Sequence, residues 1–197
     1  MKKKFSSVIL AAGESSRVGS DKLSLPLGTR SILEHTIENF SSDAVAEIII
    51  VTGKFIPKIQ KDLLSQKVRW IHNPLYEAGM SSSLKKGFES LDPSVDAVFV
   101  TPADLPLFSP QTIEQMAAMF SPQKIIIPTF QGKKGHPVLL DRAYVDQCLT
   151  EESEKVLYEV IKKNTPAVIF LPVEDEGILL DIDTMEDYET MRQNYFM

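Results

Sequence analysis

Small and cationic residues follow the first apolar stretch of the chain. Residues 11–22 read AAGESSRVGSDK, with two alanines and two glycines beside Arg17 and Lys22. Glycine lets the backbone turn sharply, so that amide N–H groups can approach an anion closely. A guanidinium grips phosphate oxygens in a bidentate way, and an ammonium acts as a mobile point charge. The segment therefore predicts a binding site for a triphosphate.

The spacing of this loop excludes two other phosphate-binding motifs. The P-loop has four residues between its glycines and then Lys-Ser/Thr, whereas five residues separate Gly13 from Gly19 and Ser20 follows. The dinucleotide fingerprint G-x-G-x-x-G fails because Ser15 stands at its second glycine position. A plain strand-to-helix turn remains the structural alternative, but the combination of glycines, alanines, Arg and Lys favours phosphate binding.

A single carboxylate, Asp104, follows the apolar run at residues 97–101. Pro102 and Pro106 stand on either side of Asp104, and their rings restrict the local backbone and aim the side chain. Magnesium prefers one or two carboxylates together with phosphate oxygens and water. An isolated Asp is more often a helix cap, but Ser109 already provides the cap of the next predicted helix. Asp104 is therefore well placed to bind Mg²⁺.

Two further acids, Asp181 and Asp183, flank Ile182 shortly before the last predicted helix. Carboxylates at that position favour the positive end of a helix dipole, which is a purely structural role. The alternative is that one of them shares a cation with Asp104. The residues alone leave both interpretations open.

A glycine and three serines follow the third predicted strand and open a helical pattern; they are Gly79, Ser81, Ser82 and Ser83. Backbone N–H groups and hydroxyls at a helix start can bind a base or a ribose. A loop with ordinary serine caps is the alternative, and both stay open at this point.

The elements that must position these residues alternate in type along the chain. Short apolar runs predict strands at residues 5–12, 47–52, 68–72, 97–101, 124–128 and 167–171. Helical spacing fills the gaps; Ser109-Pro110 opens a helix that reaches Phe120, and Thr184 opens the last one. Such alternation predicts an α/β fold with one doubly wound, mostly parallel sheet and helices on both faces. Residues 132–140 break the rhythm and predict a small antiparallel hairpin or edge strand.

Bulk properties limit the classes of protein. The 197 residues suit one domain covering 1–197, and a net charge of −6 argues against a nucleic-acid partner. Cys148 is the only cysteine, so an internal disulfide is impossible and a reducing compartment is expected. No apolar run approaches the roughly 20 residues of a membrane span, and the apolar stretch at residues 8–12 is too short for a signal peptide. We therefore expect a cytoplasmic protein that has no membrane contact.

The motifs resemble those of nucleotidyltransferases with a Rossmann-like core, and most closely the molybdenum cofactor cytidylyltransferases and their relatives. The resemblance spans most of the chain and rests on the loop, an Asp-x-Pro motif at Asp104, a Gly-Met-Ser run, a Gly-His-Pro run and an Asp-x-Asp-Thr ending. The loop matches at Leu10, Ala11, Ala12, Gly13, Ser15, Arg17, Gly19 and Lys22. Met185 departs from the family, which often has proline there.

This resemblance implies roles for the matching residues. Arg17 and the loop backbone would hold the β- and γ-phosphates, and Lys22 would reach the reacting phosphate. Asp104 and Asp183 would bind Mg²⁺, with Asp181 as the alternative to Asp183. Gly79 and the serines at 81–83 would select the nucleotide together with the loop.

The resemblance also implies the substrates. Ala12 fits the cytidylyl subgroup, because the guanylyl relatives usually have a second glycine there, and His136 of the Gly-His-Pro run would contact the acceptor. The implied reaction transfers CMP from CTP to a molybdopterin-type cofactor phosphate and releases pyrophosphate, with transient contact to a molybdoenzyme. The alternative is another NTP, such as GTP, or another phosphorylated acceptor, such as a sugar or alditol phosphate.

Overall fold

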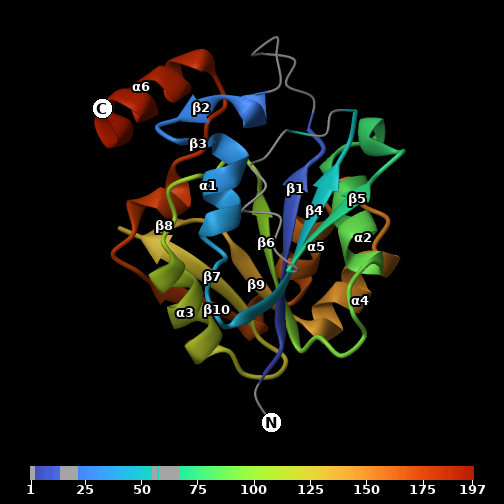
Figure 1. The fold of residues 1–197 in the computed structure, drawn as a ribbon. Helices are drawn as coiled ribbons and strands as arrows, with labels where there is room; N and C mark the ends of the chain where they lie inside the picture. Colours follow the sequence, from blue (N-terminus) through green and yellow to red (C-terminus); the bar gives the residue numbers. More distant parts are fainter. Residues whose placement is uncertain (1–2, 14–21, 55–56, 58–66) are drawn as a thin grey trace.

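A mixed sheet of eight strands forms the centre of the protein in the computed structural model, which describes residues 3–13, 22–54, 57 and 67–197 (Figure 1). Its strands are β1 (Phe5–Ala11), β4 (Val45–Thr52), β5 (Val68–His72), β6 (Ala97–Pro102), β7 (Ile125–Phe130), β8 (Lys133–Lys134), β9 (Val138–Asp141) and β10 (Val168–Pro172). They follow the order β10-β7-β9-β6-β1-β4-β5, and β8 pairs with β7. The six strands predicted from apolar runs are all present.

Parallel pairing dominates this sheet. β1 pairs in parallel with β4 and β6, β4 with β5, and β7 with β10, whereas β9 pairs antiparallel with both β6 and β7. The predicted α/β class with a mostly parallel sheet is confirmed.

The antiparallel segment lies partly elsewhere than predicted. β8 forms the expected hairpin with β7, but β9 is an interior strand, so its prediction as an edge strand was wrong. Val138, Leu139 and Leu140 are all buried, because β9 has a paired strand on each side and is covered on both faces. Three consecutive apolar residues are the pattern of such an interior strand.

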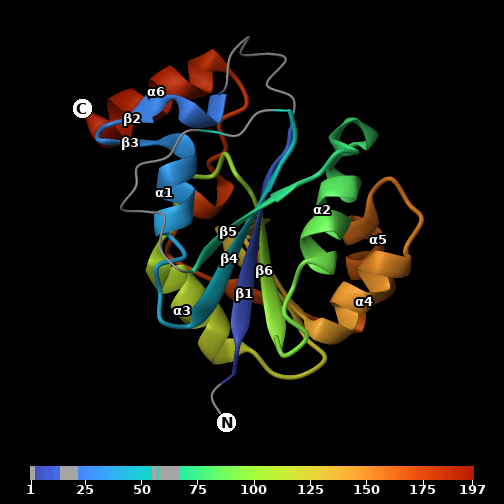
Figure 2. The same ribbon diagram turned by 45° about the vertical axis from the view of Figure 1, so that its right-hand side comes forward.

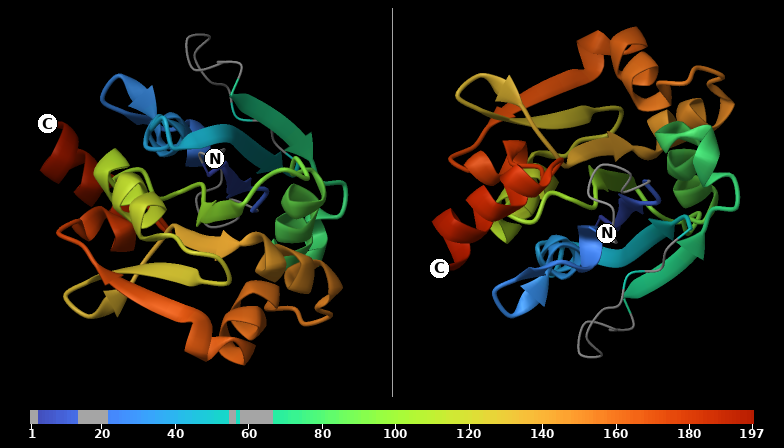
Figure 3. Two further views of the ribbon diagram at one scale, coloured as in Figure 1. Left: turned by 90° about the horizontal axis from the view of Figure 1, so that it is seen from below. Right: turned by 90° about the horizontal axis from the view of Figure 1, so that it is seen from above.

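Helices cover both faces of the sheet (Figure 2). α1 (Ile32–Glu38), α3 (Pro110–Met119) and α6 (Met185–Phe196) lie on one face, and α2 (Met80–Glu89), α4 (Arg142–Thr150) and α5 (Val156–Lys163) lie on the other. Each set packs on its own buried apolar cluster, so the sheet separates two cores. The view along the strands shows the same three layers (Figure 3).

A small hairpin joins α6 to the rest of the molecule. It consists of β2 (Pro26–Leu27) and β3 (Arg30–Ser31), and it lies beside α6 in Figure 1. The Tyr188 hydroxyl of α6 donates to the Pro26 carbonyl at 2.7 Å, and the Phe196 ring lies 4.9 Å from the His35 ring between centroids. This packing ties the C-terminal helix to the segment that follows the first strand.

The predicted helix starts are confirmed by their caps. Ser109 accepts a hydrogen bond from Thr112 N and is followed by proline at the first helical position. Thr184 forms a capping box with Asp187, in which each side chain accepts from the backbone of the other. Such caps satisfy N–H groups that the helix itself leaves unpaired. Among the described residues, none of the helices has the length and apolar character needed to cross a bilayer.

The order of the strands identifies the edge of the sheet at which a ligand is expected to bind. The chain leaves β1 toward β4 on one side, while β6 lies on the other side of β1, so the direction of winding reverses between β1 and β6. Ligands of open α/β sheets bind beyond the carboxyl ends of the strands at such a reversal. In the register of this pair Leu10 lies opposite Pro102, which brings the residues after β1 next to Asp104.

Two methionines of α3 allow a matched test of the core between this helix and the sheet. Met116 is fully buried, whereas Met119, almost one turn further along, is 46% exposed. We expect Met116→Ala to lower the free energy of unfolding by about 2–5 kcal/mol, because a cavity replaces the buried side chain. Met119→Ala should change the free energy by less than about 0.5 kcal/mol. Urea denaturation followed by circular dichroism measures both, and equal effects would contradict the assignment of this core.

Candidate active site at the carboxyl edge of the sheet

A cavity of about 580 Å³ opens where β1 and β6 end. Five residues predicted to bind nucleotide or metal line this cavity: Ala12, Gly13, Gly79, Ser83 and Asp104. They come from three separate segments of the chain, after β1, after β5 and after β6. The structure therefore brings these predicted residues together at the switch point of the sheet.

The two glycines of this cavity leave room beside the backbone. A Cβ atom at Gly13 or Gly79 would meet no atom of the described residues within 4 Å. Gly79 also has φ +92° directly before α2, a conformation that side-chain-bearing residues rarely adopt. A ligand can therefore approach the main chain closely at both positions.

Lys22 and Asp104 form the central ion pair of the site. Lys22 Nζ lies 2.8 Å from Asp104 Oδ2, and the two side chains are only 13% and 20% exposed. Lys22 also donates to the Ile182 carbonyl, while Ile182 N donates to the Asp104 carbonyl at 3.0 Å. These contacts hold the end of the glycine loop, the end of β6 and the segment before α6 in one place.

Acids gather around this ion pair. Burial raises the pKa of Asp181 above its ordinary value, and the neighbouring carboxylates of Asp183, Asp104 and Asp187 raise it further. Asp183 N donates to Asp187 Oδ2 at 3.1 Å, which fixes the backbone of the acidic segment before α6. Concentrated negative charge of this kind is relieved by a cation.

The donor set meets the requirements of a hard divalent cation that also binds phosphate. Asp104 supplies carboxylate oxygens beside the cavity, and Asp181 and Asp183 lie close enough for their charges to interact. Within the described part of the chain, no group of three or more His, Cys, Asp or Glu side chains could hold a metal. Magnesium needs only one or two carboxylates when phosphates and water complete its shell.

The three predicted serines lie in different environments. Ser83 is buried and lines the cavity, and its hydroxyl accepts a hydrogen bond from the Asn73 amide at 3.0 Å. Ser82 accepts from the same amide and donates to the Leu75 and Gly79 carbonyls, so it holds the loop before α2. Asn73, which is 2% exposed, therefore positions this segment.

Ser81 connects α2 to the neighbouring helix. Its hydroxyl donates to the Glu154 carbonyl at 2.6 Å and accepts from Val156 N at 3.1 Å. The hydroxyl thus joins the start of α2 to the start of α5. Ser81 does not line the first cavity. It lines a second one, whose walls come mainly from α2, α5 and the strands β7, β8 and β9.

Predicted residues of the glycine loop lie partly outside the described residues. Ser15, Arg17 and Gly19 belong to that part. Ala11 is the last residue of β1 and is buried, and its strand leads directly to the cavity wall at Ala12.

His136 lies on the neighbouring side of the sheet edge, where it lines the second cavity. Its backbone N donates to the Ile178 carbonyl at 3.0 Å, and its buried Nδ1 has no hydrogen-bond partner among the described residues. Burial lowers the pKa of His136, although the Val100 carbonyl and the charges of Asp104 and Asp181 act in the opposite direction. The imidazole is therefore favoured in its neutral form.

Gly135 allows its own main chain to approach the segment that leads to Asp181. A Cβ atom at Gly135 would stand 2.5 Å from the Ile178 carbonyl oxygen and 2.7 Å from its side chain. Only glycine permits that approach without displacement. The Gly-His-Pro run is thus packed directly on the 3₁₀ turn Glu176–Leu179 that precedes Asp181.

Several residues of the first cavity were not assigned a binding role from the sequence. Leu10, Tyr76, Glu77, Met80 and Pro102 also line it. The 3₁₀ turn Tyr76–Ala78 carries two of them, and it comes shortly after β5. The position of this turn after a strand was a usable signal, because the carboxyl ends of parallel strands meet at one edge.

The fold is that of the α/β nucleotidyltransferases, and the comparisons with known proteins name the family. The chain belongs to the family of the MobA-like NTP transferase domain, whose model matches residues 7–168. The resemblance drawn from the motifs is thereby confirmed.

Two curated relatives illustrate the range of the family. The chain is 28% identical over 191 residues to the molybdenum cofactor cytidylyltransferase of Escherichia coli K12, and the match covers 95% of each protein. It is 26% identical over 200 residues to a probable molybdenum cofactor guanylyltransferase of Thermococcus sibiricus, with 94% of this chain and 96% of that protein covered.

Solved structures share the fold. A nucleotidyl transferase from Methanothermobacter superposes with a TM-score of 0.80 at 23% identity, covering 96% of both chains. Rv0371c of Mycobacterium tuberculosis in complex with manganese superposes with a TM-score of 0.71 at 19% identity, covering 98% of this chain and 100% of that one. At these identities the likeness concerns the fold.

The lowered pKa of His136 predicts how the free energy of unfolding depends on pH. Between its folded pKa and the ordinary value of 6.5, the unfolded chain binds more protons than the folded one. Stability should therefore fall as the pH drops through that window, with a slope of at most about 1.4 kcal/mol per pH unit from this group. His136→Gln should lose this part of the slope.

Denaturant unfolding from pH 7.5 to 5 measures these slopes. The matched control is His72→Gln, because His72 is exposed at the end of β5. If the His136→Gln and wild-type curves stay parallel throughout the range, burial of His136 does not control its proton.

Proposed function

We propose that this protein transfers CMP from CTP to the phosphate of a molybdopterin-type cofactor and releases pyrophosphate. The observation that carries the proposal is the meeting of Lys22, Asp104 and the Asp181–Asp183 segment beside the glycine-lined cavity. The Escherichia coli relative, a molybdenum cofactor cytidylyltransferase matched over almost the whole chain, supports the choice of substrates.

The reaction is an in-line displacement at phosphorus. An oxygen of the acceptor phosphate attacks the α-phosphorus of CTP, a new P–O bond forms, and the bond to the β-phosphate breaks as pyrophosphate leaves. The acceptor phosphate is already ionised at neutral pH, so the protein does not need a side-chain nucleophile. Positioning and charge stabilisation therefore carry most of the catalysis.

Lys22 supplies positive charge to the reacting phosphates. Its ammonium pairs with Asp104, which lines the cavity, and donates to the Ile182 carbonyl, and both partners restrict where it can move. Arg17 and the amides after β1 are proposed to hold the β- and γ-phosphates. In the transition state these donors would offset the charge of the departing pyrophosphate.

Asp104 and Asp183 are the proposed ligands of Mg²⁺, with Asp181 as the alternative to Asp183. A carboxylate has two oxygens, so Asp104 can accept Lys22 on Oδ2 and still offer Oδ1 to a cation. When bound, the ion would orient the phosphates and offset charge on the attacking and leaving oxygens. The manganese complex of the Mycobacterium tuberculosis relative supports a divalent cation in this fold.

The walls of the first cavity are proposed to select the nucleotide. Ala12, Gly79 and Ser83 line it directly, so their backbone groups and one hydroxyl would face the base and ribose. Ser81 and Ser82 would act indirectly, because their hydroxyls hold the start of α2 in place. Alanine at position 12, where guanylyl relatives usually have glycine, favours cytosine.

A second candidate uses a different nucleotide or acceptor. Guanylyltransferase relatives match the chain over nearly the same length as the cytidylyltransferase, at 26% identity. Structural neighbours include a 4-diphosphocytidyl-2C-methyl-D-erythritol synthase and a CMP:2-keto-3-deoxy-manno-octonic acid synthetase in complex with CTP. GTP, or a sugar or alditol phosphate as acceptor, is therefore the alternative. With a molybdopterin acceptor, the product would pass to a molybdoenzyme through transient contact.

Nucleotide choice is tested by pyrophosphate release from each of the four NTPs. We expect release only when molybdopterin cofactor and Mg²⁺ are both present, and at least about tenfold faster with CTP than with GTP, a difference of about 1.4 kcal/mol. Reactions without acceptor are the control for hydrolysis. Turnover with GTP but not CTP would contradict the base assignment, and turnover with a sugar phosphate but not molybdopterin would contradict the acceptor.

The role of Asp104 is tested by Asp104→Asn. Asparagine keeps an oxygen that can accept from Lys22 but removes the charge that would hold the cation. Pyrophosphate release should fall by at least about 100-fold, while the free energy of unfolding changes by about 1 kcal/mol and Tm by about 2–4 °C. Asp43→Asn, at an exposed position in the turn before β4, is the control. Full activity of Asp104→Asn would remove Asp104 from the metal site.

A further inference from the structure

A second cavity of about 430 Å³ adjoins the first one. The two share Leu10 at the end of β1 and Met80 at the start of α2 as walls. Met80 is 66% exposed, although it stands between two hollows of the surface. A ligand in the second cavity would therefore reach the edge of the nucleotide cavity.

The walls of the second cavity are mainly apolar. Leu84 of α2, Ile127 of β7, Val138 of β9 and Ile161 of α5 contribute aliphatic side chains. Tyr158 adds an aromatic ring that is 59% exposed. Aliphatic walls together with an exposed ring suit a flat heterocycle, which buries both faces and can stack on the aromatic side chain.

Two lysines add positive charge to these walls. Lys134 comes from β8 and Lys155 from the residue before α5, and the acidic side chain that also lines the cavity is Glu154. Lys134 Nζ lies 4.7 Å from the centroid of the Phe170 ring, which restrains the ammonium beside the cavity. The local charge thus favours an anionic ligand, in contrast to the acids around Asp104.

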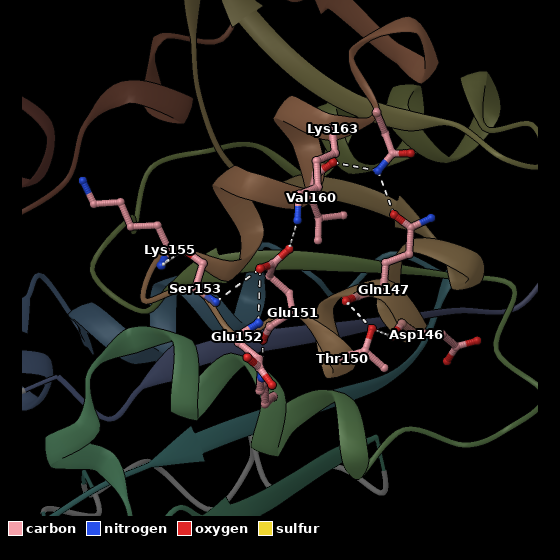
Figure 4. A network of polar contacts seen from close by, with 11 residues as sticks. Asp146, Gln147, Thr150, Glu151, Glu152, Ser153, Lys155, Val160 and Lys163 are labelled. Atoms are coloured by element: carbon pink, nitrogen blue, oxygen red, sulfur yellow. Dashed lines mark hydrogen bonds and ion pairs between the residues drawn. The ribbon is translucent and has the colours of Figure 1, made fainter.

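The segment that carries Lys155 is held in place by a polar network (Figure 4). The Glu151 carboxylate accepts from Glu152 N and Ser153 N and forms an ion pair with Lys163. Ser153 Oγ in turn accepts from Lys155 N at 3.1 Å. The main chain of this wall is therefore fixed before any ligand binds, which reduces the entropy lost on binding.

His136 connects the second cavity to the acids of the first site. It lines the second cavity, and it lies close enough to Asp104 and Asp181 to interact with their charges. Its Nδ1 is buried and has no partner in the described part of the chain, which is costly unless a ligand or water supplies one.

We infer that the second cavity binds the acceptor as a flat, mainly apolar heterocycle that carries anionic groups. The ring would lie on the aliphatic walls and Tyr158, with Lys134 and Lys155 offsetting the negative charge of the ligand. Its terminal phosphate would point across Leu10 and Met80 into the first cavity, where the α-phosphorus is attacked. This inference rests on the proposed function, because it deepens the acceptor side of that reaction.

Binding of pterin-6-carboxylate, a fluorescent flat anion, tests the cavity without turnover. Lys134→Ala should weaken its affinity about fivefold to tenfold, because one charge-assisted contact is lost. Lys133→Ala is the matched control, since Lys133 is the neighbouring exposed residue of β8 and does not line the cavity. The affinity of the Lys133→Ala variant for the probe should stay within about twofold of wild type. Equal affinities of the two variants would overturn the role of Lys134.

A second variant tests the ring site separately from charge. Tyr158→Ala should also weaken the probe about fivefold or more, through lost stacking, and the exposed position of Tyr158 leaves the core intact. If both Lys134→Ala and Tyr158→Ala bind the probe as wild type does, the inference fails.

Steady-state kinetics separate this inference from the proposed function. In the molybdopterin reaction, Lys134→Ala should raise KM for the acceptor about fivefold to tenfold and leave KM for CTP unchanged. A parallel rise in KM for CTP would place Lys134 in the nucleotide site instead. If no NTP yields pyrophosphate, the proposed function fails, while the probe titration still decides whether the cavity binds a flat anion.

Discussion

The ion pair between Lys22 and Asp104 is the contact on which the arrangement of the site depends. It joins residues 82 positions apart in sequence, and the Ile182 carbonyl, 160 positions from Lys22, accepts from the same ammonium. Three segments therefore converge on one charge. A partly buried carboxylate or ammonium is less stable without its partner, so each segment holds the others in place. The same contact keeps a cation beside acids that otherwise repel one another.

The parallel sheet makes this convergence possible. β1 and β6 end side by side with Leu10 opposite Pro102, and a hydrogen bond from Ala103 N to the Leu10 carbonyl extends the pairing by one step. The residues that follow both strands must then emerge at one edge. On the far side of β6, β9 runs antiparallel, so the Gly-His-Pro run that precedes it enters at the same edge. One interior antiparallel strand thus places His136 at this edge.

The sequence predicted those features that local patterns encode. Buried strands carry apolar runs, and the caps at Ser109 and Thr184 are formed by neighbouring residues, so both were found. The interior place of β9 depends on pairing with β6 and β7, which no local pattern records. The Ile182 carbonyl gave no signal either, because every residue has one. Three adjacent serines have different contacts because successive helical residues point about 100° apart, and only Ser83 reaches the first cavity.

The two adjoining cavities separate the chemistry of the proposed substrates. Glycines and acids surround the first, whereas aliphatic walls and lysines surround the second, with Leu10 and Met80 between them. Changes in β8 or α5 would therefore alter the second cavity without moving the Lys22–Asp104 pair. Relatives of this family carry names with different nucleotides, and structural neighbours carry names with different acceptors. A shared edge of the sheet with separately built walls explains how one fold can accommodate that variety.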